Sequence, residues 1–217
     1  LDPFSAPAML PWLLAPAAIA AGQTLVPASE LPRASQTLAP ADGGSLDMSV
    51  LTVAFTSSLL HDSHAHVNGH IVKVANPKGR FSIVEPLPGG CGTITMVSHT
   101  AERYRPKCRI AADAGYYNLS NYGCIGNVVS DGRVVQTGHF SRRNVNLGIK
   151  NGRWVVGYFK PEEVQAGGFE QLVEGLGWIV HEGKNYVEEG WRQAYSKAGA
   201  GGEGYAKSTS GRTALGF

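Results

Sequence analysis

The chain has 217 residues, of which 43% are hydrophobic and 17% are charged. This length and composition suit one folded domain with a substantial core and exclude a wholly disordered chain. The formal net charge is only +2 and there is no long run of Lys and Arg, which argues against a nucleic-acid partner. The 28 glycines and 12 prolines predict many turns between short strands.

The first 45 residues are rich in Ala, Pro and Leu and nearly free of charge. The apolar run from Met9 to Ala21 resembles the hydrophobic region of a secretory signal, although two prolines interrupt it and no basic residue precedes it. The run is too short to cross a bilayer, and we expect no membrane span in this chain. Residues 1–45 are therefore expected to form a leader-like or propeptide-like flexible segment, and residues 46–217 the domain.

Short apolar runs rich in Val, Ile and Phe predict strands at residues 49–55, 70–76 and 80–86. Residues 99–105 are expected to form one or two helical turns, and a further strand is expected to begin at Cys108 and to run into a loop. Hairpins are predicted where Asp-Gly, Asn-Gly or Glu-Gly separates two strand-like runs, because such pairs supply positive φ angles. These hairpins lie at residues 127–135, 147–159 and 178–187.

A helix is predicted over residues 161–176, since Pro161 suits a helix start and later apolar residues recur at helical spacing. Residues 190–211 are polar and Gly-rich and are expected to form a mobile loop, whereas residues 211–217 resemble the beginning of a strand. Together these patterns predict an α+β fold dominated by antiparallel sheet, with a few short helices. The helically spaced residues are Phe169, Leu172, Val173 and Leu176.

Candidate catalytic groups lie within and beyond the stretch DAGYYNLSNYGCIGNVVSDGR at residues 113–133. Asp113 stands where a strand breaks into a loop, a place from which site residues commonly project. Asp131 stands in a hairpin turn, where turn geometry alone explains it. Arg212 could grip a phosphate or carboxylate through two hydrogen bonds, or could form a surface salt bridge. Asn118 begins an Asn-Leu-Ser glycosylation sequon, which acts only in an exported chain.

Histidine and cysteine patterns leave alternatives open. Four histidines between His61 and His70 could ligate a metal, or they could lie on a solvated loop that leads to an edge strand. We expect no metal and no other cofactor. Cys91 and His99 could form a nucleophile and its base, or Cys91 could form a disulfide. An odd count of three cysteines leaves one without a partner in an exported chain.

Four motifs resemble the phosphodiester glycosidase family in their order along the chain: CRIAADAGYY, GCIGNVVSDGRVV, NLGIKNGRWVVGYF and GRTALG. The resemblance covers residues 69–217, and GNVVSDGR is its most specific part. It implies a lumenal hydrolase of the secretory pathway, in the Golgi lumen or secreted, that acts on glycoprotein glycans. Enzymes of this kind remove N-acetylglucosamine from a GlcNAc-phospho-mannose diester on lysosomal hydrolases and expose mannose 6-phosphate for sorting.

The resemblance also implies the residues of the site. Asp113 and Arg212 would be catalytic, with Asp113 acting either as the general base for water or as a group that orients the sugar. The family usually carries Asn at the position of Asp113, and an anion there would repel a phosphodiester unless Arg212 or a proton offsets it. The residues implied to bind the substrate are Gly115, Tyr116, Tyr117 and Asn127.

For the cysteines, the resemblance implies a disulfide between Cys91 and Cys124 and a partner for Cys108 that this sequence lacks. The Asp-Gly-Gly-Gly-Ser segment that the family carries later is also not found in it. We therefore expect the domain to be truncated, with a second chain or a missing segment completing it and Cys108 forming the disulfide link. The other interpretation is a catalytically incomplete domain that binds glycans or other partners.

Overall fold

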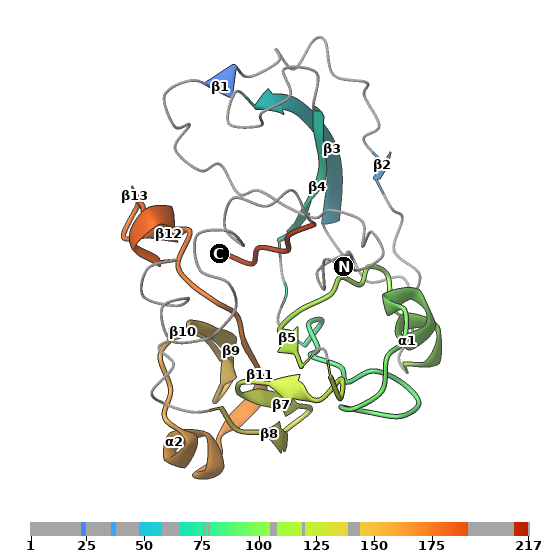
Figure 1. Ribbon diagram of the computed structural model, residues 1–217, viewed down its shortest axis with the longest axis vertical. Helices are drawn as coiled ribbons and strands as arrows, with labels where there is room; N and C mark the ends of the chain where they lie inside the picture. Colours follow the sequence, from blue (N-terminus) through green and yellow to red (C-terminus); the bar gives the residue numbers. More distant parts are fainter. Residues whose placement is uncertain are drawn as a thin grey trace. The chain divides into compact units, whose positions relative to one another are not determined.

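The fold divides into two compact units, one formed by Leu1–Gly79 with Ser208–Phe217 and the other by Arg80–Lys207. Figure 1 shows the elements of both units in chain order. Among the described residues, no helix has the length and apolar character needed to cross a membrane. The predicted boundary near residue 45 stays a prediction. The computed structural model describes residues 23–24, 36–37, 48–57, 66–75, 77, 79–104, 108–118, 120–138, 144–190 and 211–216.

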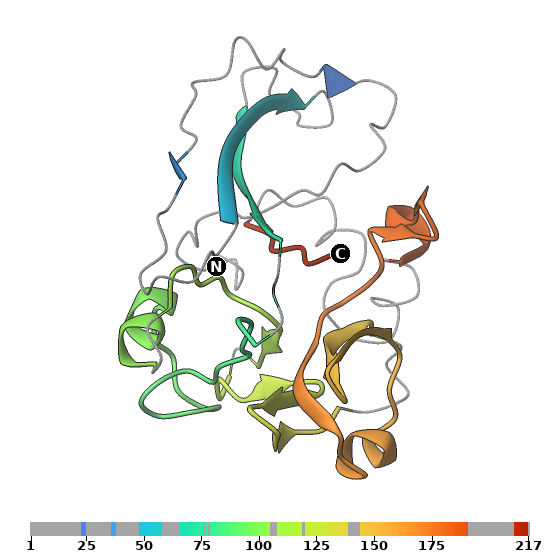
Figure 2. The same ribbon diagram turned by 180° about the vertical axis from the view of Figure 1, so that it is seen from behind.

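The first unit contains a long antiparallel ribbon of two strands (Figure 2). Strand β3 spans Met48–Ser57 and β4 spans His66–Val74, as expected for segments rich in β-branched residues. β3 also pairs in antiparallel fashion with two short strands, β1 (Gln23–Thr24) and β2 (Gln36–Thr37). The strands predicted at residues 49–55 and 70–76 are thus confirmed.

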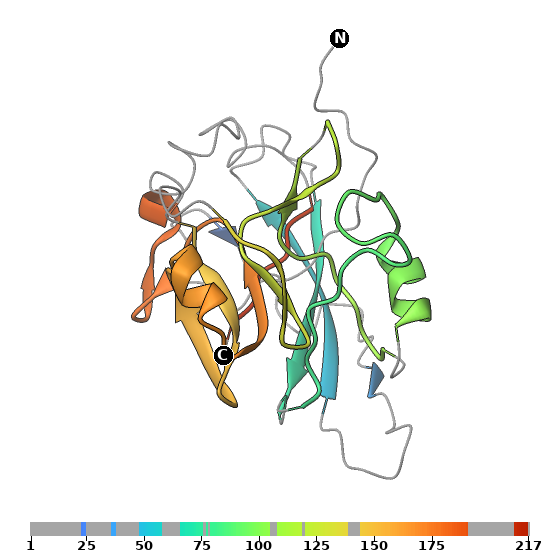
Figure 3. The ribbon, with the colours of Figure 1, turned by 90° about the horizontal axis from the view of Figure 1, so that it is seen from below.

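The second unit is built on a five-stranded antiparallel sheet with the order β10-β9-β11-β7-β8. Figure 3 shows β9, β10 and β11 side by side. The expected α+β class, with mainly antiparallel strands and a few short helices, is confirmed, whereas the expected truncation stays a prediction. The sheet strands are β7 (Val128–Ser130), β8 (Arg133–Gln136), β9 (Asn146–Lys150), β10 (Arg153–Gly157) and β11 (Phe169–Glu174). The remaining elements are α1 (Val97–Arg103), α2 (Pro161–Gln165), the pair β5 (Tyr116–Tyr117) and β6 (Cys124–Ile125), and the pair β12 (Val180–His181) and β13 (Lys184–Asn185).

All three predicted hairpins are confirmed. β7 and β8, β9 and β10, and β12 and β13 are each joined by a two-residue turn. In every turn both central residues have φ between 48° and 79°, the combination required by the mirror-image turns that match the twist of paired strands. The turn residues are Asp131 and Gly132, Asn151 and Gly152, and Glu182 and Gly183. The helical turns predicted at residues 99–105 are confirmed by α1.

Strand β11 lies in the middle of the sheet and is covered on both faces. Leu172 is fully buried in one apolar cluster and its neighbour Val173 is buried in the other, as the alternation of side chains along a strand requires. Val164 of α2 closes the first cluster, and Ile83 closes the second. Burial of one such side chain stabilises the fold by roughly 1.5–3 kcal/mol. The first cluster, around Leu172, also contains Val129 and Phe169. The second cluster, around Val173, also contains Val128.

The long helix predicted over residues 161–176 is wrong. Helix α2 ends at Gln165, and Gly167 and Gly168 follow with φ of 87° and 82°, which a helix does not accommodate. The later part is β11. A register shift after Phe169 places Phe169 and Leu172 in the same cluster. This bulge makes a strand imitate the three-residue spacing of a helix.

The strand predicted at residues 80–86 is also wrong. This segment is irregular and covers one face of the sheet, where the backbone N–H of Ile83 donates to Gln171 Oε1 at 2.8 Å. The Gln171 side chain thus accepts the hydrogen bond that a neighbouring strand would accept if this segment were a strand. The strands expected to begin at Cys108 and near residue 211 are wrong as well, because the described parts, 108–115 and 211–216, form no strand. Most of the loop expected at residues 190–211 lies outside the described residues.

A disulfide joins Cys91 to Cys124, with the Cα atoms 5.3 Å apart. The pairing implied by the family resemblance is therefore confirmed. The bond ties the turn that contains Gly92 to β6, and the Gly92 N–H also donates to the Tyr122 carbonyl oxygen at 3.0 Å. Cys108 is a free thiol, so the structure gives no support to a second chain linked through it.

We predict that the double variant Cys91→Ser, Cys124→Ser loses roughly 3–4 kcal/mol of unfolding free energy, because the bond closes a loop with a sequence separation of 33 residues. Urea unfolding followed by intrinsic fluorescence would measure the loss. Cys108→Ser is the matched control and should change the unfolding free energy by less than about 1 kcal/mol. Equal unfolding free energies for the double variant and the unaltered chain would contradict the prediction.

Candidate functional site

The Asp113–Tyr117 segment forms a corner that lies against the end of β11. Gly115 has φ of 73°, and a Cβ atom there would meet Val173 Cγ2 at 3.1 Å and the Glu174 carbonyl oxygen at 3.6 Å. Glycine adopts such a φ without strain, and because it has no Cβ atom the backbone can approach β11 this closely. β5 then pairs with β6, with Tyr117 opposite Cys124. The disulfide and the β5–β6 pair therefore fix the corner beside β11.

The side chains of this corner differ in exposure. Asp113 is exposed and Tyr116 is half-buried. Tyr117 is 36% exposed, and its ring centroid lies 6.4 Å from that of Tyr122. Asn118 is exposed, and its Oδ1 accepts a hydrogen bond of 2.8 Å from the Ser120 N–H. The corner thus presents a carboxylate and aromatic surface to solvent.

Asn127 occupies a different position, inside the protein. Its side chain is only 2% exposed. Its Nδ2 donates to Asn146 Oδ1 at 3.0 Å and to the Phe159 carbonyl oxygen at 3.3 Å, and its Oδ1 accepts from the Gly138 N–H at 2.8 Å. Both ends of the Asn127 amide are therefore engaged within the chain. Its implied contact with substrate stays a prediction.

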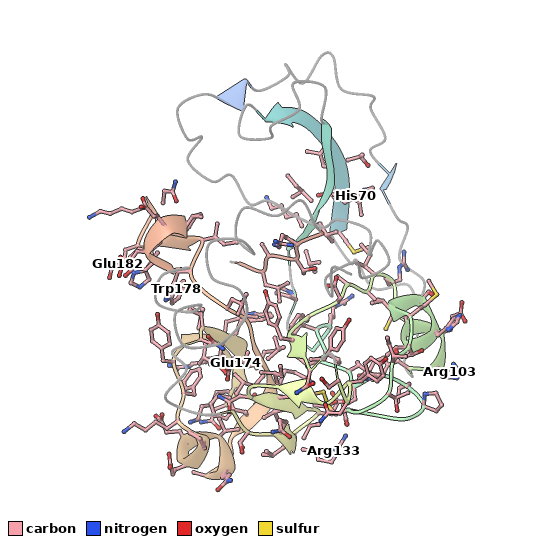
Figure 4. The ribbon with its side chains drawn as sticks, viewed as in Figure 1. His70, Arg103, Arg133, Glu174, Trp178 and Glu182 are labelled. Atoms are coloured by element: carbon pink, nitrogen blue, oxygen red, sulfur yellow. A yellow bond between two sulfur atoms is a disulfide. The ribbon has the colours of Figure 1, made fainter. Side chains whose placement is uncertain are left out.

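Glu174, the last residue of β11, is buried at 5% exposure and joins this polar network. Its Oε2 accepts from the Asn127 backbone N–H at 2.9 Å, and its Oε1 accepts from Asn144 Nδ2 at 2.9 Å. A buried carboxylate is costly unless hydrogen bonds compensate it, and bonds to a charged acceptor are the strong ones. Figure 4 shows Glu174 in the interior of the second unit, near β9 and β11.

Two glycines make room for the Glu174 carboxyl group. A Cβ on Gly126 would lie 2.6 Å from Glu174 Cδ, and a Cβ on Gly138 would lie 2.6 Å from Glu174 Oε2. Neither distance is sterically possible, so alanine at either position would displace the carboxylate. The backbone on both sides of Glu174 is thus shaped around this one side chain.

A cavity of about 210 Å³ opens beside the Glu174 carboxylate. Three segments of the second unit form its walls: β6, the end of β8 with the residues after it, and the end of β11. The walls combine the Glu174 carboxylate with an amide, a hydroxyl group, apolar surface and glycine backbone. The lining residues are Cys124, Ile125, Gly126, Gln136, Thr137, Gly138 and Glu174.

Arg212 belongs to the first unit and Asp113 to the second. Arg212 is half-buried, and its Nη1 donates to the Gly211 carbonyl oxygen at 3.1 Å. The two predicted catalytic residues therefore belong to different compact units of the chain, and their meeting in one site stays a prediction. Asp131, in contrast, has a structural place: it occupies the β7–β8 turn and accepts a hydrogen bond from Gln171 Nε2.

The cysteine chemistry left open by the sequence is resolved. Cys91 lies in a disulfide, so it has no thiolate to pair with His99. Burial raises the pKa of the Cys108 thiol above its ordinary value, which disfavours the nucleophilic thiolate.

Of the histidines considered as metal ligands, His70 has its Nδ1 atom 3.1 Å from Thr52 Oγ1, within hydrogen-bond distance. His61 and His64 lie outside the described residues.

Sequence reasoning missed the buried polar network and the cavity. Glu174 ends an apolar segment that was predicted to be part of a helix. A glutamate in a surface helix is expected to have a solvent-exposed side chain. A signal was present, because Asn127 and Asn146 both flank strongly apolar strands, where unpaired amides would be costly. Recognising it required knowing that three strand ends meet. The residues missed are Gln136, Thr137, Asn144, Asn146 and Glu174.

Known proteins similar to this chain share one name. The human N-acetylglucosamine-1-phosphodiester alpha-N-acetylglucosaminidase is 32% identical over 185 residues, covering 83% of this chain and 35% of the human protein. The mouse protein of that name is 37% identical over 127 residues, covering 57% of this chain and 24% of its own length. This chain thus spans about a quarter to a third of these curated relatives. No protein-family model matches it.

A solved structure supports the same relationship. The zebrafish N-acetylglucosamine-1-phosphodiester alpha-N-acetylglucosaminidase catalytic domain, auto-inhibited by its pro-peptide, superimposes with a TM-score of 0.56 at 29% identity. The match covers 71% of this chain and 50% of the zebrafish chain. The resemblance to the phosphodiester glycosidase family is therefore confirmed, and the chain is a homologue of the N-acetylglucosamine-1-phosphodiester alpha-N-acetylglucosaminidases.

Proposed function

We propose that the chain is part of a hydrolase that removes N-acetylglucosamine from a GlcNAc-1-phospho-6-mannose diester on lysosomal enzyme glycans, which exposes mannose 6-phosphate. The observation that carries this proposal is the shared name of relatives that are 32–37% identical to the chain. The corner that opens with Asp113 is consistent with it, since it presents an exposed carboxylate and Tyr117 to solvent.

In the proposed reaction, water attacks the anomeric carbon of N-acetylglucosamine and the bond from that carbon to the phosphate oxygen breaks. A base takes one proton from the water, and the phosphate leaves on the mannose. A phosphate is a good leaving group, so the protein mainly has to activate water and hold the negative charge. Asp113 supplies the base in this proposal, and the guanidinium of Arg212 holds two phosphate oxygens. Backbone amides after Gly115 also hold the phosphate oxygens, and Tyr116 and Tyr117 pack against the sugar ring.

A location in the secretory pathway, in the Golgi lumen or outside the cell, fits this activity. Disulfides form and persist mainly in oxidising compartments, and the chain has one between Cys91 and Cys124. The sequon at Asn118 lies on an exposed turn, accessible to a glycosylating enzyme. We include glycosylation of Asn118 in the proposal.

The first test replaces Arg212 by alanine in the protein in the form that its own cells produce. We expect kcat/KM for release of N-acetylglucosamine from a GlcNAc-phosphate diester to fall roughly 10²-fold or more, because a charged partner of the phosphate is lost. Arg153→Ala is the charge-matched control, since Arg153 is exposed at the start of β10. Unchanged kcat/KM in Arg212→Ala would remove Arg212 from the mechanism. Binding of the glycan without any hydrolysis by the unaltered protein would favour the non-catalytic alternative.

The second test replaces Asp113 by asparagine, which keeps the shape of the side chain and removes its charge. We expect kcat to fall roughly 10²- to 10⁴-fold, the usual contribution of a general base. Steady-state kinetics with the same diester would measure it. A rise in kcat/KM would instead show that the Asp113 charge only repels the phosphate, and would contradict its role as base.

The third test concerns the sequon. When the chain is secreted from a eukaryotic cell, we expect an endoglycosidase to increase its electrophoretic mobility, and Asn118→Gln to abolish this increase. The exposed Asn118 side chain and the short turn closed by the Ser120 N–H make the amide accessible. Equal mobility of treated and untreated secreted protein would show that Asn118 carries no glycan.

A further inference from the structure

The cavity beside Glu174 has the size and chemistry of a partial ligand site. Its volume of about 210 Å³ is below the roughly 300–1,000 Å³ of sites that enclose a drug-sized ligand. It can therefore accept one portion of a larger substrate. Three separate segments build it, and two glycines, Gly126 and Gly138, shape its backbone around the carboxylate.

The polar groups of the cavity favour a ligand rich in hydrogen-bond donors. A carboxylate is an acceptor with about four lone-pair sites. The two oxygens of Glu174 accept from the Asn127 N–H and from Asn144 Nδ2, which fix the orientation of the carboxylate. Gln136 and Thr137 add an amide and a hydroxyl group to the lining, and Gln136 Nε2 donates to the Thr137 carbonyl oxygen at 3.1 Å.

The same groups match donors better than acceptors. Glu174 offers acceptor oxygens and the oxygens of a phosphate diester are acceptors too, so the proposal places the phosphate outside this cavity. Sugar hydroxyl and acetamido N–H groups are neutral donors that match Glu174, Gln136 and Thr137. Ile125 and Cys124 supply apolar surface for the C–H groups of a pyranose ring.

We propose that Glu174, Gln136 and Thr137 form a subsite that binds the hydroxyl and amide groups of a neutral sugar residue. This inference rests on the proposed function for the identity of the sugar, N-acetylglucosamine. Its position is consistent with the proposed catalytic corner, since Gly115 lies against the end of β11 and Tyr117 pairs with Cys124, which lines the cavity. The carboxylate binds the sugar, and the phosphate is held by groups elsewhere.

The test measures binding of free N-acetylglucosamine to the whole oxidised chain by titration calorimetry. We expect Glu174→Gln to raise the dissociation constant roughly tenfold or more, because a hydrogen bond to a charged acceptor is weakened. Gln136→Ala and Thr137→Val should each raise it several-fold. Gln136 is exposed and Thr137 is half-buried, so these two variants, called the rim variants below, remain informative if Glu174→Gln does not fold. Gln165→Ala, an exposed glutamine of α2, is the matched control and should leave the constant unchanged.

Thermal unfolding of the same variants separates binding from structure. Gln136→Ala and Thr137→Val should unfold within a few degrees of the unaltered chain while binding the sugar less tightly. No sugar binding by the unaltered chain at millimolar concentration, or equal binding by both rim variants, would overturn the subsite. Hydrolysis of the diester with an unchanged KM in the rim variants would overturn the subsite alone. Sugar binding that depends on these residues, without hydrolysis, would support the subsite and overturn only the proposed function.

Discussion

The pairing of β11 with β7 on one edge and with β9 on the other is the interaction on which the second unit depends. β11 is the strand through which the two halves of the sheet are joined. Successive residues, Leu172 and Val173, enter the two apolar clusters. A substitution that weakens β11 therefore affects both cores at once. Five of its six residues are buried, and Glu170 alone is exposed.

The same strand carries the polar network, because burial continues to its last residue. Glu174 remains at 5% exposure although the apolar run has ended. An ionisable group in that place needs compensating donors, and the backbone of Asn127 and the amide of Asn144 provide two. The fold thus places an oriented carboxylate beside a cavity as a direct consequence of its central strand. Gly126 and Gly138 are required for the same reason, since side chains there would occupy the carboxylate's position.

The local elements could be predicted from sequence, and the tertiary ones could not. Dipeptides such as Asn151-Gly152 define hairpins by their own φ angles, without help from distant residues. β11 was assigned to a helix because its bulge shifts the alternation, a feature created by pairing with β9. The segment around Ile83 has strand-like composition, but a side chain, Gln171, binds its N–H. In both cases tertiary contacts overrode local preference.

For the site, the sequence motifs indicated the corner but not its surroundings. Glu174 is 61 positions from Asp113, and only the contact of Gly115 with the end of β11 relates the two. Cys91 and Cys124 could be paired by family resemblance, whereas three cysteines alone allowed several pairings. The cavity is formed by three strand ends from separate parts of the chain, and no local pattern encodes such a meeting.

The division of the chain gives the proposed chemistry a physical requirement. The second unit is inserted between the two parts of the first, so two covalent connections join the units, at Gly79–Arg80 and at Lys207–Ser208. The sheet, the disulfide, the corner that opens with Asp113 and the Glu174 network all belong to the second unit. They therefore depend on the packing of that unit alone, whereas the proposed role of Arg212 depends on the first unit as well.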